Sequence, residues 1–176
     1  ADGSLGVIRS NVILNAKWGL YLWGRSENVL VYNNTFLDTY DKNEGGQYDI
    51  YPVQGAYNKT LYQLDISHNC VFKNNIFTKP IRTQLEGGSS ILDEDKGNVF
   101  DSNLYDAGSL PDYVTYNYGG EGPKLTFEEL QSYQNRGFEA NGKYAAVSFV
   151  DRQTDAHLSG AANPGIHGAA NAITDS

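Results

Sequence analysis

Acidic side chains gather in two stretches of this 176-residue sequence, and carboxyl groups are common general acids and bases. The candidates are Asp38, Asp41, Glu44, Asp49, Glu86, Asp93, Glu94 and Asp95. Hydrolysis of a glycosidic bond needs two carboxyl groups about 5–10 Å apart, on either side of the bond. No spacing in these stretches singles out such a pair. We therefore interpret most of these acids as solvated loop residues.

The sequence offers one candidate metal site, the acidic triplet Asp93, Glu94 and Asp95. Carboxylate oxygens are the ligands that Ca²⁺ prefers, so a calcium ion is the possible cofactor. The triplet lacks the alternating spacing of an EF-hand loop. An elimination reaction would need a base and a cation beside an acidic sugar, for which Lys79 and Arg82 are available. The three histidines have no zinc-ligand spacing, and they are His68, His157 and His167.

Aromatic residues are the stronger candidates for binding. Exposed Tyr and Trp rings can stack on the C–H faces of sugars while nearby polar groups bond the hydroxyls. The predicted carbohydrate-binding residues are Trp18, Tyr21, Trp23, Tyr32, Tyr48 and Tyr51. Tyr32 shares its repeat position with Arg9, Lys73 and Asp101, which are all polar. We therefore expect Tyr32 to face water.

These candidates lie between copies of a six-residue repeat. The copies begin at Ile8, Val31, Phe72 and Phe100, and the fourth position of each is asparagine: Asn11, Asn34, Asn75 and Asn103. The position numbers of the asparagines differ by 34 − 11 = 23, 75 − 34 = 41 and 103 − 75 = 28. A basic repeat of about 23 residues with inserted loops predicts a stacked architecture. Short β-branched and aromatic runs separated by Gly, Asn and Asp indicate strands, so the prediction is a parallel β-helix.

An asparagine that points inward once per coil can pair with the coils above and below, because its amide carries two donors and an acceptor. We expect such an asparagine ladder along the stack, with a structural role. The single cysteine, Cys70, lies two residues before Phe72, and we expect a small buried core thiol.

The V-x-N-N-x-F pattern of the repeat resembles that of the right-handed parallel β-helix proteins of the pectate-lyase-like superfamily. The run Phe149-Val150-Asp151, followed by Asp155-Ala156-His157-Leu158 and Asn163-Pro164-Gly165-Ile166, resembles the closing segment of bacterial members. The resemblance implies an all-β, right-handed parallel β-helix. It does not select one activity, because the superfamily includes lyases, hydrolases, epimerases and binding modules.

We expect a single domain over residues 1–176. Residues 1–105 form the coils, with insertions at 38–60 and 79–97, and Gln47 to Val53 forms a short strand within the first insertion. Residues 106–176 form an irregular capping segment with one short helix, which begins at the capping box of Thr126 and Glu129 and covers the last coil. A final strand is predicted from Ala145 to Phe149. Because the repeat begins within a few residues of position 1, we expect further coils or another chain to cover the N-terminal end.

The chain has 13 basic and 21 acidic residues and a net charge of −8, which argues against nucleic-acid binding. No apolar run approaches the length that a membrane-spanning helix needs, so no membrane span is predicted. The rich aromatic content favours a secreted, extracellular or periplasmic module that binds a plant cell-wall-type polysaccharide such as xylan. One alternative is the C-terminal part of a polysaccharide lyase or glycoside hydrolase. A second is a segment of an adhesin or fibre.

Overall fold

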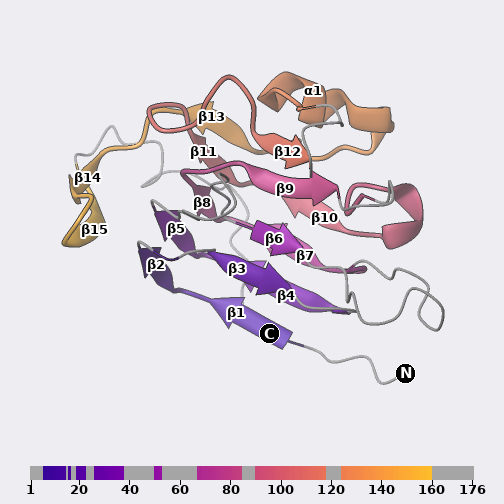
Figure 1. Cartoon of the computed structure of the whole chain (residues 1–176), viewed down its shortest axis with the longest axis horizontal. Coiled ribbons are helices and arrows are strands. Elements are labelled where there is room, and N and C mark those ends of the chain that lie inside the picture. Colours follow the sequence, from indigo (N-terminus) through magenta and orange to yellow (C-terminus); the bar gives the residue numbers. More distant parts are fainter. Residues whose placement is uncertain are drawn as a thin grey trace.

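The computed structural model describes residues 6–14, 16, 19–22, 26–37, 50–52, 67–84, 90–117 and 124–159. Almost all regular structure in these residues is β, with one short α-helix (Figure 1). The strands are β1 (Gly6–Arg9), β2 (Val12–Leu14), β3 (Leu20–Leu22), β4 (Val29–Tyr32), β5 (Thr35–Leu37), β6 (Ile50–Pro52), β7 (Val71–Lys73), β8 (Ile76–Phe77), β9 (Ile81–Gln84), β10 (Val99–Asp101), β11 (Leu104–Asp106), β12 (Thr115–Asn117), β13 (Lys143–Ala145), β14 (Phe149–Asp151) and β15 (Asp155–Leu158).

The first twelve strands recur in groups of three, and we call each group a tier. Each strand of a tier pairs with, or lies beside, the strand in the same place of the next tier. The first sheet has the order β1-β4-β7-β10 and the second has the order β13-β11-β8-β5-β2. The third strands form two pairs, β3-β6 and β9-β12, and β6 lies next to β9. All of these pairings are parallel, which confirms the prediction of a parallel β structure.

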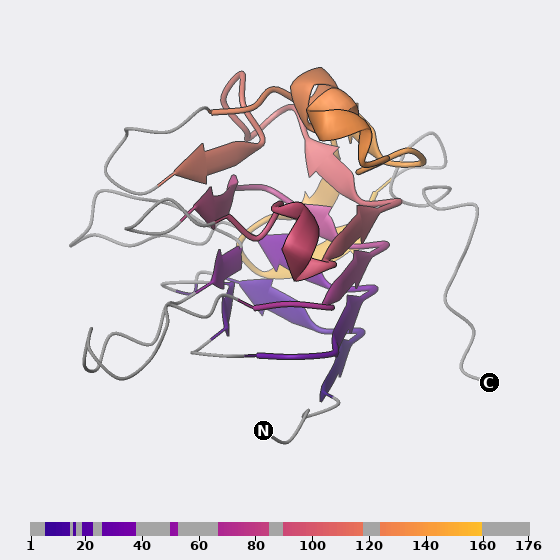
Figure 2. The same cartoon turned by 90° about the vertical axis from the view of Figure 1, so that its right-hand side faces the viewer.

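The sequence repeat sets the register between tiers. Ile8 pairs with Val31, Val31 with Phe72, and Phe72 with Phe100, so the first positions of the four copies lie side by side. The last positions also align, from Ile13 through Phe36, Phe77 and Tyr105. Colours in both views run from indigo at one end of the stack to orange at the other (Figure 1, Figure 2).

The corner between the first and second strand of each tier explains the residues that precede the asparagines. Ser10, Asn33, Asn74 and Ser102 all have positive φ, between 55° and 60°. This left-handed region disfavours β-branched and bulky residues and tolerates asparagine. The small or amide residue ahead of each asparagine is therefore a requirement of the turn.

Aromatic side chains form the core between the sheets. The rings of Phe72 and Phe100 stack with centroids 4.4 Å apart, and those of Phe36 and Phe77 stack at 5.4 Å. These four side chains are at most 1% exposed, and each contributes about 1.5–3 kcal/mol of burial free energy. Cys70 is also fully buried in this core, as predicted, and its burial raises the pKa of the thiol.

Helix α1 (Phe127–Ser132) lies at the end of the stack that carries β13 (Figure 1, Figure 2). Its capping box is confirmed, because Glu129 N donates to Thr126 Oγ1 and Thr126 N donates to Glu129 Oε2. Phe127 and Leu130 are buried in the core, and the Phe127 ring lies 5.6 Å from that of Tyr105. The helix therefore covers the last complete tier, and a 3₁₀ turn over Tyr133–Asn135 follows it.

Strands β6 and β9 lie inside the segments predicted as insertions at 38–60 and 79–97, because a tier has a third strand that the six-residue repeat does not include. The segment after residue 105, predicted as an irregular cap with one helix and a final strand, also supplies β12 and β13. The run Ala145 to Phe149 is not one strand, because β13 ends at Ala145 and β14 begins at Phe149 and pairs antiparallel with β15. The short strand expected within Gln47 to Val53 is confirmed as β6.

Candidate binding surface

The third strands of the tiers bring aromatic positions together. Tyr21 of β3 is in register with Tyr51 of β6. On the next two tiers, Arg82 of β9 is in register with Tyr116 of β12. Figure 1 shows β3, β6, β9 and β12 in succession along the stack.

Neighbouring residues show which face of these strands is the inner one. Leu20 packs against the hydrophobic core, Ile81 is 1% exposed and Thr115 is fully buried. In a regular strand successive residues alternate between faces, and the positions that follow these inner residues are Tyr21, Arg82 and Tyr116, with Tyr51 in register with Tyr21. The side chains at these four positions lie outside the described residues.

Tyr21 and Tyr51 are two of the predicted carbohydrate-binding residues, and they lie in register on adjacent tiers. Their role in binding stays a prediction. Sequence analysis did not single out Tyr116, which lies on β12 of the same series of third strands. The side chains of Trp18, Trp23 and Tyr48 lie outside the described residues.

The expectation that Tyr32 faces water is wrong, because only 3% of it is exposed. It lies in register between Arg9 on one neighbouring strand and Lys73 on the other. Arg9 Nη1 lies 3.4 Å from the Tyr32 hydroxyl. Long cationic side chains can cover an aromatic neighbour with their aliphatic stems, so a polar repeat position does not guarantee an exposed ring.

The structure does not bring the acidic triplet together as a metal site. Asp93 accepts a hydrogen bond from Ser90 N at 2.8 Å, and Asp95 pairs with Lys96. Glu94 is exposed at the start of a 3₁₀ turn over Glu94–Lys96. Among the described residues no group of three or more His, Cys, Asp or Glu side chains could hold a metal ion, so the calcium prediction is wrong for this triplet. The other acidic candidates, Asp38, Asp41, Glu44, Asp49 and Glu86, lie outside the described residues.

The four repeat asparagines form a hydrogen-bonded series, which we call the asparagine column. Asn11 Nδ2 donates to Asn34 Oδ1, Asn34 Nδ2 to Asn75 Oδ1, and Asn75 Nδ2 to Asn103 Oδ1, each at 3.0 Å. The backbone N of each donor residue reaches the same oxygen at 2.9–3.1 Å. Asn34, Asn75 and Asn103 are buried, so each side chain connects two tiers and has no access to a ligand.

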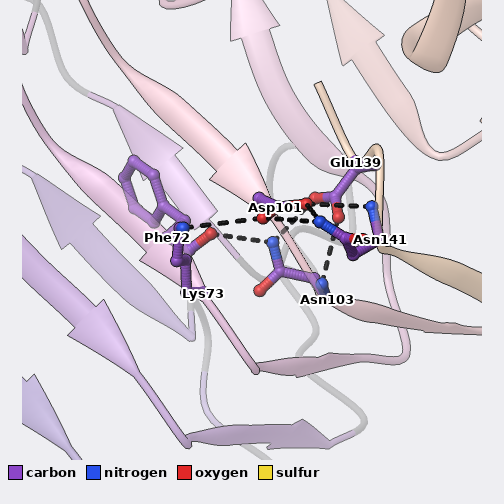
Figure 3. A network of polar contacts seen from close by, with 6 residues as sticks. All are labelled: Phe72, Lys73, Asp101, Asn103, Glu139 and Asn141. Atoms are coloured by element: carbon purple, nitrogen blue, oxygen red, sulfur yellow. Dashed lines mark hydrogen bonds and ion pairs between the residues drawn. The ribbon is translucent and has the colours of Figure 1, made fainter. Parts of the chain in front are cut away.

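Glu139 closes one end of this column (Figure 3). Its Oε1 accepts from Asn103 Nδ2 at 2.7 Å and its Oε2 accepts from Asn103 N at 3.0 Å. The Tyr105 hydroxyl donates to Oε1 at 2.9 Å. Glu139 is fully buried and has a positive φ of 52°. Sequence reasoning did not find this residue, because it lies outside the repeat.

Burial raises the pKa of Glu139 to about 7, even though the donors from Asn103 and Tyr105 favour the carboxylate. The nearby negative charge of Asp101 also raises the pKa of Glu139. Asp101 itself lies at the surface of the stack, 3.5 Å from Lys73 Nζ, and accepts from Asn141 N at 3.0 Å (Figure 3). A pKa near neutrality is a property that catalytic acids share, but three internal donors and full burial give Glu139 a structural role.

Comparisons with known proteins add no relative: no family model, no curated protein and no solved structure matches this chain. Within the described ranges, no helix is long and apolar enough to cross a membrane. The case for function therefore rests on the arrangement of the chain's own residues.

Proposed function

We infer that the chain is a right-handed parallel β-helix of the pectate-lyase-like type, with the tiers as its coils and the asparagine column as its ladder. Three observations support this interpretation: the parallel register of equivalent strands, the repeated left-handed corner residues, and the series of amide bonds through Asn34 and Asn75. A stack of this kind has flat outer faces that run along its length.

We propose that the chain is a secreted module that binds a plant cell-wall-type polysaccharide, of which xylan is an example. The observation that carries the proposal is the register of Tyr21 on β3 with Tyr51 on β6, on adjacent tiers. The proposal takes both rings to face outward, together with Tyr116 on β12 further along the stack. Aromatic rings provide apolar faces for sugar C–H groups, while their hydroxyls can bond to sugar oxygens.

The spacing of these positions favours a polymer over a single sugar. Neighbouring strands lie about 4.8 Å apart, so positions on successive tiers form a strip along the stack. An extended chain can contact several tiers at once, and each contact adds to the binding free energy. The site is proposed to lie along β3, β6, β9 and β12.

Affinity electrophoresis against xylan and a panel of other soluble polysaccharides tests the proposal. The double variant Tyr21→Ala/Tyr51→Ala should bind about 30-fold more weakly, from roughly 1 kcal/mol for each ring. The matched control is Tyr144→Ala, which removes an exposed tyrosine from β13 in another sheet and should leave binding unchanged. Absence of binding to every polysaccharide, or equal loss in the control, would overturn the proposal.

A catalytic alternative rests on Arg82 of β9, which is in register with Tyr116 of β12. A guanidinium group beside a sugar-binding strip could neutralise a uronate during elimination. Release of reducing ends, or a rise in the absorbance of unsaturated uronates during incubation with pectate or alginate, would favour a polysaccharide lyase or glycoside hydrolase. Binding without either signal favours the binding module.

A further inference from the structure

In the part of the chain that the structure describes, the first tier forms an uncovered end of the stack. β1 and β2 are the outermost strands of the first and second sheets, and both lie at the same end. Ile8 and Ile13 are half-buried there, whereas their equivalents in the next tier, Val31 and Phe36, are fully buried. Val12 is 58% exposed. Among the described residues, the core positions of this tier therefore have apolar neighbours on one side only.

The hydrogen bonds of the asparagine column all run in one direction, from Nδ2 of one asparagine to Oδ1 of the asparagine in the next tier. The group at the first-tier end is therefore an acceptor, Asn11 Oδ1. In the interior of the stack, Asn34 Oδ1 takes two donors, the backbone N and the Nδ2 of Asn11. Asn75 Oδ1 takes the same two donors from Asn34. Asn11 uses its own Nδ2 for Arg9 O and Asn34 Oδ1. Within the part of the chain that the structure describes, nothing donates to Asn11 Oδ1.

This direction argues against a second copy of the chain as the partner. Two copies that met through their first tiers would place one Asn11 acceptor opposite the other, with no proton between them. Contact between the first tier of one copy and the last tier of another is blocked, because Glu139 occupies the end of the column and α1 covers the core there. The opposite ends of the stack therefore do not complement each other.

We propose that the first tier is a docking edge for a further β tier from a different stretch of polypeptide. This tier runs parallel to β1 and β2, places apolar side chains over Ile8 and Ile13, and presents a backbone N–H and a side-chain amide to Asn11 Oδ1. The chemistry of the partner is thus that of one more repeat, with asparagine or a similar donor at the position of the column. The inference does not depend on the polysaccharide proposal.

Duplication of the chain's own first tier supplies such a partner. Gly6 pairs with Val29, so a copy of residues 6–28 placed directly before Gly6 gives the new asparagine and Asn11 the same spacing as Asn11 and Asn34. The fusion should raise the Tm of the full chain by about 4 °C or more and slow amide exchange in β1 at least tenfold. A fusion carrying a scrambled copy of the same segment is the control for length and composition.

An equal rise in Tm with the scrambled copy, or unchanged exchange in β1 with the native copy, would overturn the proposal. If the fusion does not fold, the peptide of residues 6–28 is added in excess to the native chain and exchange in β1 is measured. Slower exchange supports the docking edge, and unchanged exchange overturns it. A native chain that dimerises through β1 and β2, with dimer formation abolished by Val12→Lys in β2, would also overturn it, because the partner would then be a second copy.

Discussion

Gly142 occupies the position of a fifth asparagine in the column, and the Glu139 carboxylate fills the space that a side chain there would need. Leu104 N donates to Asn75 O at 2.8 Å, and Lys143 N donates to Asn103 O at the same distance. Gly142, which precedes Lys143, therefore corresponds to Asn103, which precedes Leu104. A Cβ atom added to Gly142 would overlap Glu139 Oε2 and crowd the Glu139 Cβ. The Glu139 carboxylate can therefore close the column only because residue 142 has no side chain.

Substitution of Gly142 by alanine should destabilise the fold by about 1–3 kcal/mol, the usual cost of overpacking a filled interior. The added methyl group meets both a buried carboxylate and the backbone oxygen of Asn103, at 3.2 Å, and neither has room to retreat. Urea unfolding followed by circular dichroism measures the change in free energy.

The matched control for this substitution is Gly6→Ala. An added Cβ there would lie 3.6 Å from Val29, which is an ordinary contact. We expect this variant to be as stable as the wild type. Equal stability of the two variants would show that Glu139 does not fill the position of Gly142.

The buried acid should make stability depend on pH around neutrality. Burial raises the pKa of Glu139 from 4.5 to about 7, so the folded protein binds a proton between these values that the unfolded chain has lost. Stability from this group is fully present below about pH 4.5 and is lost as the pH rises through about 7. A shift of this size corresponds to about 3 kcal/mol. Denaturant midpoints measured from pH 4.5 to 8 should decrease across this window.

Two variants isolate the contribution of Glu139 from that of its neighbours. Glu139→Gln removes the ionisation, so its stability should change little between pH 4.5 and 8. The control Glu128→Gln alters an exposed acid on the same cap and should keep the wild-type slope. Asp101, the nearby acid, has a pKa lowered from 3.8, since its burial is outweighed by bonds from Asn141 and by Lys73, and it titrates below this window. Wild-type stability that rises with pH in the window contradicts the prediction.

Position within the asparagine column should decide the cost of losing an amide. Asn75→Ala removes the acceptor of the buried Asn34 backbone N, whereas Asn34 Nδ2 keeps Ile8 O and Tyr32 O as acceptors. The substitution also removes the Nδ2 donor that Val31 O and Asn103 Oδ1 share. A buried group without a partner costs about 1–3 kcal/mol, so the total loss should be about 3 kcal/mol. Asn11→Ala removes no acceptor that a described residue uses, and it should cost about 1 kcal/mol. Chemical denaturation of both variants would contradict this view if Asn11→Ala were the more destabilised.

The six-residue repeat was sufficient to predict the parallel register of the first two strands in each tier. Ile8, Val31 and Phe72 are all apolar because these positions face the same core. The repeat was not sufficient to predict the third strands. β6 begins 50 − 37 = 13 positions after β5 ends, whereas β9 begins 81 − 77 = 4 positions after β8 ends, so no fixed spacing marks them in the sequence.

At the candidate site, too, the sequence predicted residue types but not their three-dimensional surroundings. Tyr21 and Tyr51 were predicted as binding residues from residue type alone, and their register became apparent only with the third strands. Exposure was misjudged at Tyr32 because the repeat shows which face a residue is on but not how much its neighbours cover it. Glu139 was missed because its partner, Asn103, lies 139 − 103 = 36 residues away, across the helix and outside any repeat.

Asp106, a second buried acid, should determine how firmly the segment around Val147 is attached to β11. Asp106 is fully buried at the end of β11 and accepts from Val147 N at 2.9 Å and from Arg152 Nη1 at 3.0 Å. Burial alone would raise the pKa of Asp106, but the donors from Ser109, Val147 and Arg152 outweigh it and hold the pKa below its usual value. This contribution to stability is present above about pH 4 and is lost as the pH falls through the lowered folded pKa.

Replacement of Asp106 by asparagine should cost about 3 kcal/mol, because Arg152 and the buried amide of Val147 lose their carboxylate partner. Arg152→Ala should cost only about 1 kcal/mol, since the Arg152 side chain is 33% exposed and the remaining donors still satisfy Asp106. Hydrogen exchange should show faster opening at Val147 in the first variant than in the second. An equal effect of both would mean that the ion pair, and not the set of backbone donors, attaches this segment to β11.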